Sequence, residues 1–326
     1  MSNRNLKDLK DTYKRRDILL PSIERHVLKK AQEPSTRQTD VMHPSEMAKS
    51  DWCGRHDFYR MTGVPINYKG RSPSFRLENV FDYGHSVHAK YQRWLTEMGV
   101  MWGTWQCKTC GYRWVGGTPT DCPECASSDI RYKEVSLWNE DLMVSGHSDG
   151  VVRLDDDVYR MIEIKTVGIS TLRFEAYSLF DQYQTERLTP EELWFLIKRP
   201  FATHIRQGQI YLHLARAQYP ELNIDEIVFI YEWKPTQEVK EFVVKYNPEL
   251  ISKTLAAAEG VAEAVRLGRE PERPEWAGED GKTCSSCEYR TTCWGTNNDR
   301  TESKENGPVV RVQRSTSAKR SRAIRS

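Results

Sequence analysis

Eight cysteines form the first chemically informative pattern in this chain of 326 residues, and they divide into two sets of four. In one set, two Cys-x2-Cys pairs are separated by eleven residues, with Gly111 after the first pair and Pro123 inside the second. Each pair directs two thiolates at one point, and two pairs complete the tetrahedral four-sulfur site that Zn²⁺ prefers. We therefore predict a zinc site made by Cys107, Cys110, Cys122 and Cys125.

Disulfide bonds are the alternative use of these four cysteines, and they are typical of small secreted domains. The segment from Met1 to Lys10 carries charges throughout and lacks the apolar run of a signal peptide. This favours a reducing compartment, so we expect a cytoplasmic protein whose cysteines are free thiols or metal ligands.

The other four cysteines lie far apart in the sequence, with Cys53 near the start and Cys284, Cys287 and Cys293 close together near the end. Four thiolates can hold a 4Fe-4S cluster, and a tetrahedral four-sulfur site also suits Zn²⁺. Ligand type alone leaves both metals open. In either case the set would act as a staple, because its two parts become neighbours only when the chain folds.

Two carboxylates and a lysine form a second candidate centre. Asp149 lies three residues after Gly146, and Glu163 and Lys165 are separated by one residue in the next strand-like run. Side chains alternate between the faces of a strand, so Glu163 and Lys165 should share a face, and a hairpin would bring Asp149 close to them. Such carboxylates suit Mg²⁺ or Mn²⁺, and Lys165 could orient the attacking water. A surface Glu-x-Lys pair without function is the alternative, because such short matches are common.

Two helical segments contribute further polar residues. His88 lies in a helix expected from about residue 82 or 84 to residue 98, and Gln207 and Tyr211 lie one turn apart on a later helix. Gly208 lowers the stability of that helix, which indicates that another part of the chain approaches its backbone closely. Taken alone, His88 would more often be a core or surface residue, and the Gln207–Tyr211 pair part of a packed helix.

The remaining segments indicate a mixed α/β core. Strand-like patterns cover residues 132–138, 142–154, 158–166, 226–233 and 239–246, with an Asp-rich turn at 155–157. Helical patterns cover residues 18–28, 170–179, 190–198, 203–218 and 248–267. Strands followed by helices and then by returning strands imply a mixed sheet whose site lies at a strand edge.

Composition adds constraints on partners. A hydrophobic content of 38% allows a substantial core, and no apolar run approaches the roughly 18 residues of a membrane span. The net charge of +2 neither favours nor excludes a polyanion. Residues 308–326 contain six Lys or Arg and no acidic residue, which predicts a disordered tail that could hold nucleic acid or remain solvated without a partner.

The order of these polar residues along the chain resembles that of the PD-(D/E)XK nuclease superfamily, in its RecB-like branch. The matching positions are His88, Gly146-x2-Asp149, Glu163-x-Lys165 and Gln207-x3-Tyr211. The resemblance implies that the divalent metal is bound by His88, Asp149, Glu163 and the backbone carbonyl of Ile164. It also implies that Lys165 assists the nucleophilic water and that Gln207 and Tyr211 line the DNA path.

The ends of the chain extend this resemblance. His43-Pro44-Ser45 before Cys53, and the closing Cys-x2-Cys-x5-Cys, resemble the CRISPR-associated RecB-like exonucleases and the nuclease domain of AddB. This implies a structural 4Fe-4S cluster on Cys53, Cys284, Cys287 and Cys293. The resemblance covers about residues 43–295. The chain departs from the pattern in lacking a proline before Asp149 and in carrying the Cys-x2-Cys module.

We therefore expect a restriction-endonuclease-like α/β fold, with a mixed sheet flanked by helices, an inserted zinc ribbon at 102–131 and an iron-sulfur staple. The expected regions are a loosely ordered segment 1–40, a nuclease domain 41–298 and a basic tail 299–326. The expected activity is metal-dependent hydrolysis of DNA, as an exonuclease on single-stranded ends, without a membrane partner. Two rivals remain. One is a non-catalytic DNA-binding or recruitment protein, in which the ribbon and the basic tail bind DNA or a partner protein. The other is a redox or iron-sensing protein.

Overall fold

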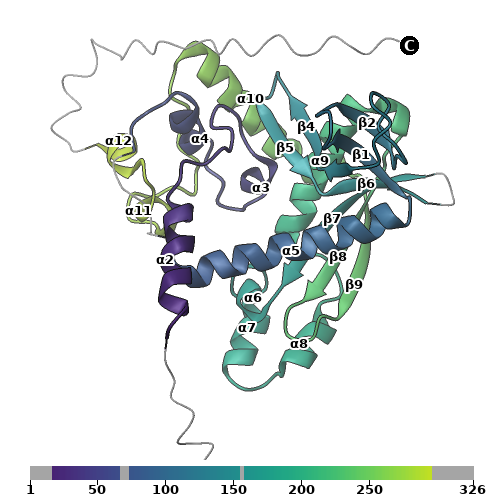
Figure 1. Cartoon of the computed structure of the whole chain (residues 1–326). Helices are drawn as coiled ribbons and strands as arrows, with labels where there is room; N and C mark the ends of the chain where they lie inside the picture. The colour runs from purple at the N-terminus through teal and green to yellow at the C-terminus, as the bar shows by residue number, and fades with distance from the viewer. Residues whose placement is uncertain (1–16, 67–72, 155–157, 296–326) are drawn as a thin grey trace, which may run out of the picture. The chain divides into compact units, whose positions relative to one another are not determined.

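A computed structural model of the chain describes residues 17–66, 73–154 and 158–295 (Figure 1). The basic tail 299–326 and the Asp-rich turn 155–157 lie outside these residues, as does the first part of segment 1–40. The described residues form two compact units, one made by 17–37 with 73–86 and the other by 38–66 with 87–295. The smaller unit contains helix α2 (Leu20–Ala31), at the expected amphipathic stretch, and the first half of α5 (Phe75–Glu97).

The larger unit is built on a seven-stranded sheet with the order β2-β1-β6-β7-β8-β9, in which β3 also pairs with β1. Pairing is parallel between β7 and β8 and antiparallel elsewhere in this sheet. Its strands are β1 (Met101–Cys107), β2 (Arg113–Gly117), β3 (Ile130–Lys133), β6 (Gly150–Arg153), β7 (Tyr159–Val167), β8 (Glu226–Trp233) and β9 (Val239–Lys245). Strands β4 (Val135–Asn139) and β5 (Val144–Ser148) pair separately as a two-stranded sheet.

Helices and short 3-10 turns complete the larger unit. They are α3 (Pro44–Met47), α4 (Gly54–Met61), α6 (Ile169–Glu175), α7 (Tyr177–Gln184), α8 (Pro190–Leu196), α9 (Ala202–Gln218), η1 (Pro220–Leu222), η2 (Pro248–Leu250), α10 (Ser252–Leu267), α11 (Lys282–Ser285) and α12 (Arg290–Trp294). The pattern at 170–179 thus forms parts of two helices, and the pattern at 248–267 forms a 3-10 turn followed by α10. Among the described helices, none is both long and apolar enough to cross a bilayer.

Alternation along the central strands divides the core between two faces of the sheet. On β7, Ile162 and Ile164 pack with Val87 and Tyr91 from the second half of α5. Met161 and the other side of the strand pack in the larger cluster that contains the apolar residues of α9. Figure 1 shows β7, β8 and β9 side by side. Because neighbouring side chains in a strand point to opposite faces, Glu163 and Lys165 belong to the α9 face.

The expected strands 132–138 and 142–154 are each divided in the structure. The first run becomes β3 and β4, separated at Glu134, and the second becomes β5 and β6, separated at Asp149. At both places the chain passes between the large sheet and the two-stranded sheet. The second break is held by Ser148, whose Oγ lies 3.2 Å from the Gly150 carbonyl oxygen and 3.4 Å from the Gly150 amide nitrogen. These two divisions place two carboxylates at the junction of the sheets.

The segment predicted as a zinc ribbon, called the ribbon below, shares a strand with the large sheet. Strand β1 pairs with β2 and β3 inside the ribbon, and its first residues, Met101 and Trp102, pair with Val152 and Val151 of β6. The segment predicted as an inserted module is therefore continuous with the sheet that carries the candidate site.

Gly208 provides a test of how tightly α9 packs on the sheet. A Cβ at this position would lie 2.7 Å from Cζ of Phe229 and 3.0 Å from Cδ1 of Ile227 on β8, which agrees with the close approach expected from the sequence. Gly208→Ala should therefore lower the free energy of unfolding by about 1–3 kcal/mol through overpacking. Gly260→Ala, in the exposed middle of α10 where a Cβ meets nothing within 4 Å, should instead add about 0.5–1 kcal/mol. Urea unfolding measures both, and equal stability of the Gly208 variant and the parent would contradict this packing.

Candidate metal centre

Asp149 is the centre of a set of four hydrogen bonds from three different elements. Its Oδ1 lies 2.8 Å from Nδ1 of His88 on α5, and its Oδ2 accepts a bond of 2.6 Å from the backbone N–H of Ile164 on β7. Its backbone carbonyl accepts bonds from Nε2 of Gln92 at 3.0 Å and from the hydroxyl of Tyr132 at 3.1 Å. Asp149 is buried, so these contacts fix both its backbone and its carboxylate.

The two strand registers explain why acidic residues gather around Asp149. Val135 pairs with Ser148 in the small sheet, so the next position of that ladder places Glu134 opposite Asp149. Gly150 pairs with Ile162 in the large sheet, so the next position of that ladder places Asp149 opposite Glu163. Asp149 itself is paired in neither ladder, but it lies directly beside the last pair of each, and its ligand atoms come within 4.8 Å of those of Glu134.

Glu163 and Lys165 lie together on the α9 face, as the alternation of β7 predicts. Lys165 Nζ donates to Glu163 Oε1 at 2.7 Å and to Gln207 Oε1 at 3.1 Å, and Gln207 Nε2 donates to the Tyr211 hydroxyl at 3.2 Å. Gln207 and Tyr211 are themselves buried. They hold Lys165 in place in this structure, and their role in lining a DNA path stays a prediction.

The second carboxylate oxygen of Glu163 has no partner among the described residues. Oε2 is buried and accepts no hydrogen bond there, although Glu163 is only 3% exposed. Burial raises the pKa of Glu163 to about 7, against the opposing effect of Lys165 and with a further upward contribution from Asp149. A buried acceptor without a partner is costly, so this oxygen is suited to a cation that the protein itself does not supply.

Glu134 is a candidate ligand that the sequence analysis missed. Ligand atoms of His88, Glu134 and Asp149 all lie within 4.8 Å of one another. Partial desolvation, followed by the negative charge of Asp149, raises the pKa of Glu134. Its sequence signal lay in the hairpin register: once Val135 is paired with Ser148, Glu134 falls opposite Asp149.

His88 completes the mixed donor set. Desolvation lowers its pKa, but the hydrogen bond to Asp149 and the charges of Asp149 and Glu163 raise it by more, so the net shift is upward. The imidazole of His88 and the carboxylates of Asp149 and Glu134 form the type of donor set that binds Mg²⁺ or Mn²⁺. Glu163 is not part of this group within 4.8 Å, and its role as a ligand, like that of the Ile164 carbonyl, stays a prediction. The structure thus brings His88, Asp149, Glu163, Ile164 and Lys165 into one region, and their roles as metal ligands and catalytic residues stay predictions.

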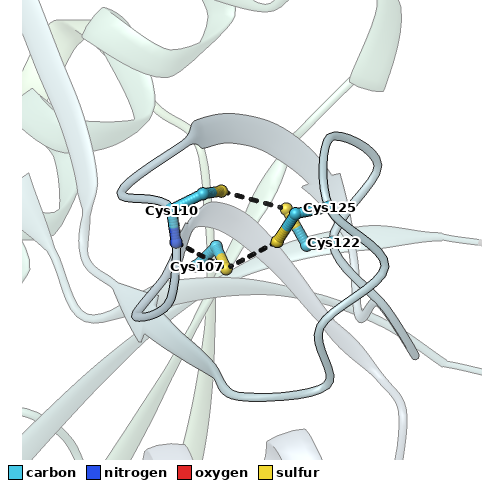
Figure 2. A group of neighbouring side chains, drawn as sticks. All are labelled: Cys107, Cys110, Cys122 and Cys125. Carbon is cyan, nitrogen blue, oxygen red and sulfur yellow. Dashed lines mark hydrogen bonds between the residues drawn. The ribbon is translucent and has the colours of Figure 1, made fainter.

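The four cysteines of the ribbon gather around one point (Figure 2). Sγ of Cys107 lies 3.6 Å from Sγ of Cys125, and Sγ of Cys110 lies 3.7 Å from Sγ of Cys122. A tetrahedral zinc site with Zn–S bonds of about 2.3 Å has S···S edges of about 3.8 Å, whereas a disulfide needs about 2.0 Å. The backbone N–H of Cys110 helps to lower the pKa of Cys107 to about 6, which favours the thiolate. The donor set fits zinc.

The other four cysteines line one small cavity between the start of α4 and the segment that contains α11 and α12. Burial raises the pKa of Cys53 and Cys287, and each is raised further by the charge of Cys293. Among the described residues, these sulfurs are not part of a group within 4.8 Å, unlike those of the ribbon. Four thiolates lining one cavity are the ligand type of a 4Fe-4S cluster, and a cluster on these cysteines stays a prediction.

Aromatic and charged contacts hold the two sides of this cavity. Tyr289 packs against His56 and Tyr59 of α4, with ring centroids 5.1 and 5.4 Å apart respectively. Arg273 donates to the Cys293 carbonyl. The N-terminal cysteine and the C-terminal triad are therefore brought together by direct packing.

No protein-family model and no curated protein matches the chain. Among solved structures, the protein SSO0001 is 12% identical over 85% of this chain and 96% of its own, with a TM-score of 0.36. An alkaline exonuclease from Laribacter hongkongensis, LHK-Exo, is 11% identical over 71% of this chain and 90% of its own, with a TM-score of 0.35. Its complex with dAMP gives 12% identity with the same coverage and TM-score. The function of this chain therefore has to follow from the geometry of its own site.

Removal of the Glu134 carboxylate tests its place among the metal ligands. Groups that merely hydrogen-bond to metal ligands change affinity by about 10–100-fold, so Glu134→Gln should weaken Mn²⁺ binding by at least about tenfold. Glu140→Gln, an exposed residue of the same hairpin, should bind Mn²⁺ like the parent. Isothermal titration of the anaerobically purified protein measures both affinities. Unchanged binding by Glu134→Gln would remove Glu134 from the centre.

A cysteine substitution tests the staple. Cys287→Ala should abolish visible absorption by an iron-sulfur cluster and lower Tm by about 5–10 °C, for a loss on the order of 2–3 kcal/mol in a domain of this size. Thr291→Ala, exposed on α12, should retain both the absorption and the stability. Thermal unfolding under argon, with an absorption spectrum beside it, gives both readouts. A colourless variant with parental stability would contradict a structural cluster.

Proposed function

We propose that the chain is a metal-dependent deoxyribonuclease that hydrolyses phosphodiester bonds with Mg²⁺ or Mn²⁺. The observation that carries this proposal is the buried, unpartnered oxygen of Glu163 beside Lys165 and Asp149. Oε2 of Glu163 can thus accept a cation next to the ammonium group of Lys165. A metal ion and an ammonium group both stabilise the negative charge that develops on a phosphate during hydrolysis. Most buried side-chain oxygens have a hydrogen-bond partner, so an unpartnered one is evidence for a missing ion or water.

Each side chain has a distinct role in this proposal. The ion would be held by His88, Asp149, Glu163, the carbonyl of Ile164 and Glu134. When bound, a divalent cation supplies Lewis-acid polarisation of the scissile phosphate and lowers the pKa of the attacking water.

Lys165 would act from the other side of Glu163. Desolvation lowers its pKa, but the charges of Glu163 and Asp149 raise it by more, so Lys165 stays protonated. Its ammonium group, held by Gln207, can orient water and stabilise charge on the phosphate.

The finer parts of the proposal come from the sequence resemblance and from the donor sets. Action as an exonuclease on single-stranded DNA ends, within a nuclease domain at 41–298, follows from the resemblance to RecB-like exonucleases. The ribbon cysteines would hold Zn²⁺ and the staple cysteines a 4Fe-4S cluster. Both groups would be structural, because hydrolysis of a phosphodiester needs no electrons and both lie on the framework around the site.

Two substitutions test the catalytic assignment. Glu163→Ala removes a metal ligand and Lys165→Ala removes the ammonium group, so each should lower DNA cleavage by at least about a hundredfold while DNA binding remains. Glu241→Ala and Lys253→Ala, both exposed, serve as matched controls. The assay follows end-labelled single and double strands with Mn²⁺ or with EDTA, using anaerobically purified protein.

The outcomes separate the proposal from its main rival. Cleavage at the parental rate by either variant would refute the site. DNA binding by the parent without cleavage at any Mn²⁺ concentration would instead indicate a DNA-binding or recruitment protein.

A further inference from the structure

An open cleft of about 610 Å³ separates the ribbon from the β4–β5 hairpin. The ribbon contributes Thr104 of β1, Arg113 of β2 and Tyr132 and Lys133 of β3 to its lining. Gln92 of α5 and Glu134 line it as well, and the hairpin supplies the remainder. A volume in this range is typical of ligand-binding clefts, which span about 300–1,000 Å³.

The cleft opens onto the metal centre through shared residues. Glu134 lines the cleft and is also one of the three residues whose ligand atoms lie within 4.8 Å of one another. Tyr132 and Gln92 line the cleft and donate hydrogen bonds to the Asp149 carbonyl. A molecule in the cleft would therefore lie next to the ion-binding carboxylates.

The cleft is lined by two cationic side chains and by one carboxylate. Arg113 and Lys133 come from the ribbon strands, and among the described residues neither has an ion-pair partner. The carboxylate of Glu134 lies at the metal centre. A guanidinium and an ammonium group of this kind bind phosphate oxygens, and guanidinium can do so with two parallel hydrogen bonds. The cleft thus offers two cations to a chain of phosphates, and it shares Glu134 with the candidate metal centre.

We propose that this cleft holds the substrate strand, with Arg113 and Lys133 binding backbone phosphates beside the bond to be cut. The ribbon is then a wall of the substrate site, and zinc maintains the strand geometry that presents these two cations. This inference rests on the proposed nuclease function, because it assigns the same substrate to the same centre.

The test measures DNA binding separately from cleavage. In a Glu163→Ala background, which prevents hydrolysis, the double variant Arg113→Gln with Lys133→Gln should bind a fluorescein-labelled single-stranded oligonucleotide roughly tenfold more weakly. Each phosphate contact of a single strand contributes about 0.7 to the salt dependence, so the slope of log K against log salt concentration should fall by about 1.4. The two single variants should each give about half of that change in slope.

Controls distinguish loss of phosphate contacts from loss of structure. Zinc content should match that of the Glu163→Ala protein, and the Mn²⁺ affinity of the double variant with Glu163 restored should match that of the parent, because neither Arg113 nor Lys133 is a ligand. The pair Lys253→Gln with Arg269→Gln removes the same charge from exposed positions on and just after α10, and should leave both affinity and slope nearly unchanged.

The results decide the cleft and the nuclease function independently. The cleft would be overturned if the double variant binds DNA with the same affinity as the α10 control, or if the parent does not bind DNA. The first of these results would leave the ribbon available to a protein partner. The predicted loss of affinity and slope, in a protein whose parent cuts no DNA, would support the cleft and overturn the nuclease. If the parent cuts DNA but the double variant binds DNA as tightly as its Glu163→Ala background does, the nuclease function would be supported and the cleft overturned.

Discussion

The passage of one chain between two sheets is the constraint on which the candidate centre depends. The β4–β5 hairpin leaves the large sheet at Glu134 and returns to it at Asp149. A carboxylate at such a crossing lies beside the ends of both ladders, and for this reason Asp149 comes close to Glu134 and its charge acts on Glu163. Bringing acidic groups together costs free energy through repulsion and desolvation. The hydrogen bonds to Asp149 from Ile164, Gln92 and Tyr132 oppose that cost and keep the group assembled.

The two faces of the sheet then divide the remaining tasks. On one face, α5 delivers His88 to Asp149 and packs Val87 and Tyr91 on β7. On the other face, α9 delivers Gln207 to Lys165. Small residues make the second contact possible. A Cβ at Gly146 would lie 2.9 Å from Cδ of Pro44 and 3.0 Å from Cε1 of Tyr211, so the glycine of the Gly146-x2-Asp149 motif is required by close packing of α3 and α9.

Much of this arrangement was predictable from local patterns. Strand β8 matches the expected range 226–233, because its continuous run of β-branched and aromatic residues is a strong local signal, and the clustering of the ribbon cysteines follows from their spacing. Glu134 was not predictable in that way. Composition shows that residues 132–138 and 142–154 favour extended structure, but it does not show that each run changes partner in the middle. The sharing of β1 between the ribbon and the large sheet was missed for the same reason, since strand pairing is a long-range property.

The cavity lined by Cys53 and the C-terminal triad also has a consequence for biosynthesis. Cys53 leaves the ribosome early, whereas Cys284, Cys287 and Cys293 follow only after every residue of the metal centre has been translated. Closure of so long a segment constrains the unfolded chain strongly, because the entropy removed by a cross-link grows with the number of residues it encloses. Nascent or prematurely terminated chains would lack this clamp. A group held by all four thiolates would therefore form only after residues 284–293 have been translated, later than the residues of the candidate metal centre.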